Sequence, residues 1–241
     1  MKAVILSGGR GISLPGRGDF ITKALINVNG MPLIYYILKH LYFYGIKEII
    51  LCVDSFSEKN IVKFLDDKTQ KPSLVNLISK LKIQVIDHGK KGKTGSMLFG
   101  IRKLLEHEDF LATYNDIITD INISKLLQYH KEKNKIFTVT GVHPIIRHGV
   151  IKHKDGLIVG YNLDEQIGTT IKGGYFVLKP AISKYLSDDC VLENEPFQTL
   201  ISESQAVVFE HHGFWKQFDS YKHIEEMEKL FRDDNLPWMI R

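Results

Sequence analysis

The chain has 241 residues and a net charge of +4, and its 44% hydrophobic and 25% charged residues match an ordinary soluble globular protein. The mild positive charge is spread along the chain, so it does not indicate a nucleic-acid-binding protein. No apolar run approaches the ~20 residues of a membrane span, the first apolar run is too short for a secretory signal, and the two cysteines suggest no disulfide framework. We therefore expect a cytoplasmic protein that binds neither nucleic acid nor membrane.

The first 142 residues alternate between strand-like and helical patterns. Strands are expected over residues 2–6, 48–53, 82–86, 109–113 and 137–142, and helices over residues 32–44, 58–65, 94–105 and 123–130. This alternation is typical of the α/β class with a Rossmann-like, doubly wound and mostly parallel sheet. In such sheets the ligand site lies at the carboxyl ends of the strands.

The pattern changes after residue 142. Residues 150–153 and 157–161 are expected to form a β-hairpin, followed by strands at 174–178 and 206–210, a helix near 181–186 and an amphipathic helix at 221–231. These segments predict a smaller mixed β subregion packed onto the same sheet. Because no linker, repeat or low-complexity tract separates the two parts, we expect one domain over residues 1–241, with halves 1–142 and 143–241.

The first strand ends in the glycine-rich segment SGGRG, residues 7–11. Backbone N–H groups of such a turn form a concave anion site, and the missing Cβ atoms let a phosphate approach closely. The spacing is neither the dinucleotide-binding fingerprint nor the P-loop. The segment therefore predicts a phosphate-binding loop, with a plain strand-to-helix turn as the structural alternative.

The order of motifs resembles the nucleotidylyltransferases that make nucleotide sugars, whose signature is G-G-x-G-T-R-L-x-P followed by P-K-P and G-x-P. Here the motifs are GGRGISL at residues 8–14, TKA at 22–24 and GMPL at 30–33. Later segments resemble the glucose-1-phosphate cytidylyltransferase branch, namely RHG at 147–149, GGYFVL at 173–178, EPFQTL at 195–200, EHHGFWKQFD at 210–219 and LPW at 236–238. The resemblance spans nearly the whole chain and implies a fold of the nucleotide-diphospho-sugar transferase type.

The resemblance implies a Mg²⁺-dependent reaction of CTP with a phosphorylated acceptor, giving a CDP-linked product and pyrophosphate. Two anionic reactants must meet, and a Mg²⁺ ion held by two carboxylates reduces their repulsion. By resemblance, Asp116 and Asp219 bind the metal, and Lys23 completes the catalytic set by balancing phosphate charge. Structural alternatives are an Asx-turn or helix N-cap for Asp116, a helix N-cap for Asp219, and a solvated surface position for Lys23.

The same resemblance makes residues 1–142 the nucleotide-binding half and 143–241 the acceptor-side half. The expected nucleotide-binding residues are Leu6, Ser7, Gly8, Gly9, Arg10, Gly11, Thr94, Gly95, Ser96 and Asn115. Gly95 would let the planar base pass close to the backbone, whereas the structural alternative is a helix that Thr94 caps. We interpret the nearby Asp120 as a structural cap of the helix that follows it.

Several family positions are altered here. Ser13 stands where the signature has arginine, and Arg10 or Arg17 could supply the missing charge, although an arginine is sensitive to placement. On the acceptor side, Leu163 replaces the lysine that holds a sugar phosphate, and Lys172 replaces an asparagine.

These changes leave the acceptor open. The expected acceptor-binding residues are Arg147, Lys172 and Gly174. The acceptor is either a sugar 1-phosphate such as glucose 1-phosphate, for bacterial surface polysaccharide biosynthesis, or a non-sugar phosphate such as phosphoglutamine, for capsule modification. A catalytically degenerate nucleotide-binding relative is the third alternative, and a homo-oligomer is compatible with all of them.

Five histidines invite a metal interpretation: His143, His148, His153, His211 and His212. Their spacings match no zinc template. His211 and His212 lie in a strand-like run, where neighbouring side chains point to opposite faces. We therefore expect no zinc site.

Overall fold

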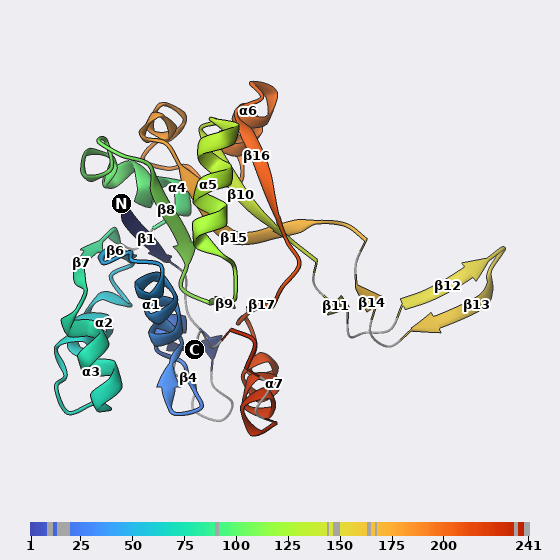
Figure 1. Ribbon diagram of the computed structural model, residues 1–241, viewed down its shortest axis with the longest axis horizontal. Coiled ribbons are helices and arrows are strands. Elements are labelled where there is room, and N and C mark those ends of the chain that lie inside the picture. Colours follow the sequence, from blue (N-terminus) through green and yellow to red (C-terminus); the bar gives the residue numbers. More distant parts are fainter. Residues whose placement is uncertain are drawn as a thin grey trace.

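The computed structural model describes residues 1–8, 12–13, 20–89, 92–143, 145–146, 150–162, 165–166, 168–233 and 236–238. Its centre is a seven-stranded sheet with the order β16-β10-β15-β8-β1-β6-β7 (Figure 1). These strands are β1 (Lys2–Ser7), β6 (Glu48–Val53), β7 (Lys82–Asp87), β8 (Phe110–Tyr114), β10 (Phe137–Val142), β15 (Ile171–Leu178) and β16 (Ala206–His211). All neighbouring pairs are parallel except that β15 runs antiparallel to both β8 and β10. The predicted mostly parallel α/β sheet with a mixed region is confirmed.

Helices cover both faces of this sheet. The α-helices are α1 (Leu33–Phe43), α2 (Glu58–Asp66), α3 (Pro72–Ser79), α4 (Thr94–Gly100), α5 (Ile123–Lys133), α6 (Glu195–Ser202) and α7 (Tyr221–Arg232), and the 3-10 helices are η1 (Lys23–Leu25), η3 (Arg102–Leu104) and η4 (Pro180–Tyr185). Ala3 and Ile5 of β1 belong to the apolar cluster that includes α1, while Val4 and Leu6 belong to the cluster that includes α4. Because successive residues of a strand face opposite sides and both sides are covered, β1 reads as a continuous apolar run.

Short strands form small two-stranded sheets outside the central sheet. They are β2 (Ile12–Ser13), β3 (Phe20–Ile21), β4 (Asn27–Val28), β5 (Met31–Pro32), β9 (Ile117–Thr119), β11 (Ile145–Ile146), β14 (Glu165–Gln166) and β17 (Trp215–Gln217). Strand β9 pairs with β17, which brings the chain just after β8 beside the chain just before α7. A third apolar cluster, with Phe218, Met227 and Trp238, packs α7 in this region.

The predicted hairpin is present as β12 (Val150–Lys154) and β13 (Leu157–Asn162), and it projects from the body of the molecule (Figure 1). Its turn holds Asp155 and Gly156 at φ angles of 50° and 84°, a backbone region that favours Asp, Asn and Gly. Leu157 is 74% exposed.

Within the described part of the chain, no helix is both long enough and apolar enough to cross a membrane.

Two predicted helices differ from the structure. The helix expected over residues 94–105 ends at Gly100 and continues as the 3-10 turn η3, and the segment near residues 181–186 is the 3-10 helix η4. Helices α3 and α6 were not predicted, although each carries a proline in its first turn, which is a common helix start.

The prediction that Asp120 caps a helix is wrong. Helix α5 begins after Asn122, whose side-chain oxygen accepts a hydrogen bond from the Lys125 backbone N–H at 3.0 Å. Asp120 Oδ1 instead lies 3.0 Å from Nε2 of His211, the last residue of β16.

Candidate active site

The carboxyl ends of β1 and β8 open into a cleft of about 350 Å³. It is lined by Leu6, Gly8, Lys23, Thr94, Tyr114, Asn115, Asp116, Lys172, Val191, Glu193 and Gln217. Most of these residues were predicted site residues, and the fold gathers them from distant parts of the chain at the edge where a ligand site was expected. Their individual roles in binding and catalysis stay predictions.

Asp116 lies beside Lys23 in this cleft. Asp116 follows the end of β8 and is 5% exposed. The Lys23 ammonium, at the start of η1, lies 2.7 Å from Asp116 Oδ2, and Gln217 donates a hydrogen bond to the same oxygen at 3.4 Å. Lys23 is therefore a paired cleft residue and not a solvated surface lysine.

The second oxygen of Asp116 carries the main indication of a ligand. Asp116 Oδ1 is buried, and no hydrogen-bond partner for it is found within the described residues. A buried carboxylate oxygen without a partner is costly. This atom is therefore available to a metal ion or to a donor group of a bound ligand.

Asp219 lies next to Asp116 through the backbone. The Phe218 N–H donates a hydrogen bond to the Asp116 carbonyl at 2.8 Å. This bond holds the backbone of the next residue, Asp219, close to that of Asp116. Its side chain is 57% exposed, however, and its Oδ1 lies 2.8 Å from Nδ1 of His223. The cap residue of α7 is Ser220, so the N-cap alternative for Asp219 is wrong.

The two carboxylates fit a Mg²⁺ ion by their chemistry, since this ion prefers oxygen ligands and binds through one or two carboxylates. The unpartnered Oδ1 of Asp116 supplies one ligand atom. Asp219 would supply another only after its carboxylate exchanges His223 for the ion. Burial is the main cause that lowers the pKa of His223, and the charge of Lys216 adds to it, whereas the negative charge of Asp219 opposes the shift.

The start of α4 has a different capping arrangement from the predicted one. Lys93 is the N-cap residue, and the Ser96 hydroxyl bonds both the N–H and the carbonyl of Lys93. The Thr94 hydroxyl donates to Glu193 Oε2 at 2.7 Å and accepts from the Leu192 N–H at 3.0 Å. The alternative that Thr94 caps the helix is therefore wrong, and its side chain anchors the 192–193 segment to the cleft.

Gly95 has a packing reason to be glycine. A Cβ atom there would lie 2.4 Å from Cys190 Sγ and 2.9 Å from the Cys190 carbonyl oxygen. Cys190 therefore fills the space on the side of Gly95 where a Cβ atom would project, and a nucleotide base has no room to pass there. Contact of the Gly95 backbone with a nucleotide stays a prediction.

The glycine-rich loop is described only at its start. Asn115 donates a hydrogen bond to the Ser7 hydroxyl at 2.7 Å, which joins the ends of β8 and β1. A Cβ on Gly8 would lie 2.6 Å from the Gly92 carbonyl oxygen, so the chain needs glycine there. Four predicted site residues lie outside the described part of the chain: Gly9, Arg10, Gly11 and Arg147. Arg17 and Leu163, which were discussed as alternative or altered family positions, also lie outside it. Ser13 is described only as part of the backbone of β2.

Lys172 reaches the cleft from β15. Its ammonium lies 3.1 Å from Glu193 Oε1, 3.3 Å from the Tyr114 hydroxyl and 5.1 Å from the centre of the Tyr114 ring. Burial lowers the pKa of Lys172, and the negative charge of Asp116 opposes this shift. The cleft thus contains a second cation paired with an acid.

Gly174 packs closely against Tyr114, which lines the cleft. Its φ angle is +73°, and a Cβ there would lie 2.2 Å from Cδ1 of Ile117 and 2.7 Å from Cδ2 of Tyr114. Its predicted importance is therefore explained by backbone conformation and close packing. Direct contact with an acceptor stays a prediction.

A family model described as "Nucleotidyl transferase" matches residues 2–209. The chain belongs to the nucleotidyl transferase family. This nucleotidyl transferase is 30% identical to a Bacillus subtilis protein named "Probable glucose-1-phosphate cytidylyltransferase", with 100% of both chains covered. It is 27% identical to the glucose-1-phosphate cytidylyltransferase of Salmonella typhimurium, with 99% of this chain and 98% of that protein covered. The resemblance found in the sequence and the enzyme class are confirmed.

Solved structures share the fold of this nucleotidyl transferase. UDP-glucose pyrophosphorylase complexed with UDP-glucose matches with a TM-score of 0.74 at 14% identity, covering 97% of this chain and 98% of that chain. HddC from Yersinia pseudotuberculosis complexed with GMP-PN matches with a TM-score of 0.72 at 18% identity, covering 95% and 99%. At these identities the comparison supports the architecture alone.

Four cleft residues of the nucleotidyl transferase were not predicted as site residues from the sequence: Tyr114, Val191, Glu193 and Gln217. Tyr114 directly precedes Asn115, and Gln217 lies two residues before Asp219, so closeness to these predicted site residues in the sequence was a usable signal. Glu193 had no such signal, because it enters the cleft through a turn whose position depends on Cys190 packing against α4.

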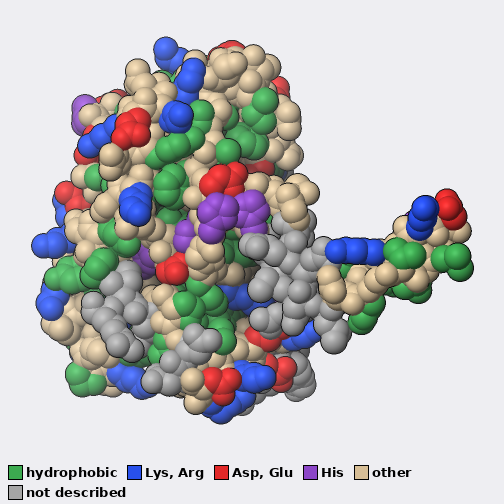
Figure 2. Space-filling model, turned by 45° about the vertical axis from the view of Figure 1, so that its right-hand side comes forward, with side chains coloured by type: hydrophobic (Ala, Val, Ile, Leu, Met, Phe, Trp, Pro, Cys, Tyr) green, Lys and Arg blue, Asp and Glu red, His purple; other side chains and the backbone are tan. Residues whose placement is uncertain are grey.

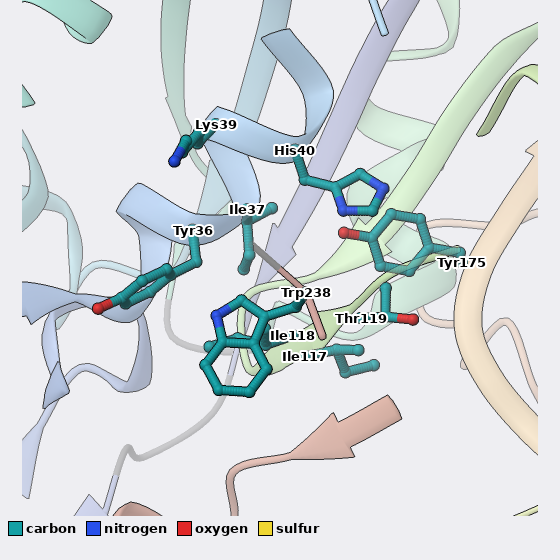
Figure 3. A pocket seen from close by; sticks show the side chains of 9 residues that line it. All are labelled: Tyr36, Ile37, Lys39, His40, Ile117, Ile118, Thr119, Tyr175 and Trp238. Carbon is teal, nitrogen blue, oxygen red and sulfur yellow. The ribbon is translucent and has the colours of Figure 1, made fainter. Parts of the chain in front are cut away.

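A much smaller cavity of about 20 Å³ lies between α1 and β9 (Figure 3). Its lining is Tyr36, Ile37, Lys39, His40, Ile117, Ile118, Thr119, Tyr175 and Trp238. The volume suits about one water molecule, so this cavity admits no nucleotide. Burial lowers the pKa of His40, and its Nε2 lies 2.9 Å from the Ile121 carbonyl oxygen, which is the arrangement of a structural histidine.

Proposed function

We propose that this nucleotidyl transferase is a Mg²⁺-dependent cytidylyltransferase that acts on CTP and a phosphorylated small molecule. An oxygen of the acceptor phosphate bonds to the α-phosphorus of CTP, and the bond from that phosphorus to the β-phosphate oxygen breaks, which releases pyrophosphate and leaves a CDP-linked product. The observation that carries the proposal is the unpartnered, buried Asp116 Oδ1 beside Lys23 in the cleft. The names of the two cytidylyltransferase relatives support CTP as the nucleotide.

The acidic and basic residues would have different roles in this reaction. Asp116 and Asp219 would hold Mg²⁺, which when bound reduces the repulsion between the two phosphate groups. Lys23, whose ammonium lies 2.7 Å from Asp116, would balance the negative charge of the nucleotide phosphates. The nucleophile belongs to the acceptor, so no protein side chain has to remove a proton.

The acceptor is a sugar 1-phosphate such as glucose 1-phosphate, as the names of the relatives suggest. A phosphorylated amino-acid derivative such as phosphoglutamine is the second candidate. The pair of Lys172 and Glu193, at 3.1 Å, favours it, because adjacent opposite charges suit an acceptor with both an ammonium and a carboxylate group. Either product is an activated donor for surface polysaccharide assembly or capsule modification, and we assign the reaction to the cytoplasm, where CTP is made.

The test measures pyrophosphate release by the full chain with CTP, Mg²⁺ and each acceptor in turn, and identifies the product by mass spectrometry. We expect release with one acceptor class, faster with CTP than with UTP, dTTP or GTP. Lys23→Ala should lower the rate by about 100-fold or more, whereas Lys59→Ala, an exposed lysine of α2, should not. A faster reaction with another nucleotide contradicts the cytidylyl assignment. Binding of CTP without turnover of any acceptor indicates a degenerate relative instead.

A further inference from the structure

His143, Glu210 and His212 form a cluster outside the cleft. The three side chains each offer one ligand atom, and these atoms all lie within 4.8 Å of one another. Figure 2 shows histidine side chains gathered on one face of the molecule with an acidic side chain beside them. None of these groups is used in the reaction proposed above.

The sheet register explains why these residues meet. Strands β10 and β16 are parallel, and Val142 lies opposite His211. His143 and His212 each come one residue later, so they are neighbours across the pair. Glu210 and His212 are two residues apart and therefore face the same side of the sheet. His211 faces the other side, where it lies 3.0 Å from Asp120, in agreement with the predicted alternation.

Contacts within the cluster hold the side chains in place. His143 Nε2 lies 2.7 Å from Glu210 Oε2, and the Thr170 hydroxyl donates to Glu210 Oε1 at 3.3 Å. The rings of His143 and His212 are parallel within 4°, with centroids 5.0 Å apart. Thr170 thus orients the carboxylate from outside the cluster, as outer partners do at metal sites.

We propose that His143, Glu210 and His212 bind a divalent transition-metal ion of the Zn²⁺ type. Two imidazole nitrogens and one carboxylate oxygen are a ligand set that Zn²⁺ accepts, whereas Mg²⁺ prefers oxygen ligands alone. The side chains of His143 and Glu210 are 16% and 43% exposed, and His212 is exposed, so an ion enters from solvent. In a tetrahedral site the three ligand atoms, which now lie within 4.8 Å of one another, would move closer together around the ion.

The bound ion has one coordination position left for water or an anion. Because its ligands lie at and just beyond the ends of β10 and β16, the ion would tie the edge strand of the sheet to its neighbour. The sequence predicted no zinc site because the histidine spacings match no zinc template and because His211 and His212 face opposite sides of a strand. Only the parallel register of β10 and β16 reveals the cluster.

The test titrates the untagged full chain with ZnCl₂ by isothermal titration calorimetry, with excess Mg²⁺ present so that the cleft carboxylates do not compete. We expect one saturable site, which His143→Ala and His212→Ala each weaken by at least about tenfold. His153→Ala is the control, because this histidine is exposed on the hairpin strand β12. The Asp116→Asn variant should bind Zn²⁺ as well as the wild type does.

Co²⁺ provides a second readout that is independent of activity. The wild type should show the visible absorption of a tetrahedral Co²⁺ site, and His212→Ala should lose it. His212 is exposed, so this variant should fold. Unchanged Zn²⁺ affinity in the His143→Ala/His212→Ala double variant, or the lack of any saturable binding by the wild type, would overturn the proposal.

Discussion

Replacement of Asp116 by asparagine separates a functional role from a structural one. At 2.7 Å from Lys23, the attraction between the two charges is about 6 kcal/mol at an effective dielectric constant of about 20. Desolvation of the two ions costs several kcal/mol each, and Lys23, whose side chain is 27% exposed, regains contact with water when its partner becomes neutral. We therefore expect Asp116→Asn to change the free energy of unfolding by only about 1 kcal/mol.

The activity should change far more. Loss of the carboxylate removes the proposed metal ligand, and we expect kcat to fall by about 100- to 1,000-fold, which corresponds to about 3–4 kcal/mol. Pyrophosphate release measures the rate, and thermal unfolding measures stability, with a change in Tm of about 2–4 °C per kcal/mol at this chain length. Asp66→Asn, an exposed acid at the end of α2, serves as the matched control. Full activity of Asp116→Asn would refute the reasoning, as would a large loss of stability that accounts for the loss of activity.

Three further predictions concern packing, acceptor binding and pH. Gly174→Ala should lower the free energy of unfolding by about 2–4 kcal/mol in chemical denaturation, because a Cβ at φ +73° would lie 2.2 Å from Ile117. The control Gly156→Ala, at φ +84° with no atom near its Cβ, should cost only about 1 kcal/mol. Equal losses in the two variants would contradict the role of the contact with Ile117. Lys172→Ala should raise KM for the acceptor by about tenfold and leave KM for CTP nearly unchanged, and equal changes in both would remove its assignment to the acceptor. Burial lowers the pKa of His130 below its ordinary value. As pH falls, this imidazole therefore binds a proton in the unfolded chain before it does so in the folded protein. Its contribution to the free energy of unfolding is complete above about pH 6.5 and is lost as pH falls below that value. Unfolding free energies measured between about pH 7.5 and about pH 5.5 should therefore decrease, less steeply in His130→Gln, and an increase would contradict this.

The local part of the fold could be predicted because it depends on short runs. Residues 48–53 and 137–142 form strands with the expected bounds. The first is apolar from Ile49 to Val53, and the second alternates apolar residues with Thr138 and Thr140, and nearly all of these residues are buried, as in a strand covered on both faces. The order of motifs in the family pattern predicted Lys23 and Asp116 as members of one catalytic set, and their charged atoms lie 2.7 Å apart. Periodicity alone could not have joined them.

The rest depends on pairings between distant segments. The antiparallel β15 lies between β8 and β10, and its place cannot be read from its own residues. Glu193 enters the cleft because Cys190 packs against Gly95, and His143 meets His212 because β10 and β16 are in register. Each of these contacts is fixed only when the whole sheet has formed.

The position of β15 has a consequence for how the protein is made. Strands β7, β6, β1 and β8 can pair as soon as the chain has left the ribosome up to residue 114, because each lies beside another member of this set. Strand β10 emerges next, but both of its sheet neighbours, β15 and β16, are still unsynthesised. It must therefore wait with unpaired backbone until residue 178 has emerged, so the nascent chain carries an incomplete sheet edge through that interval of translation.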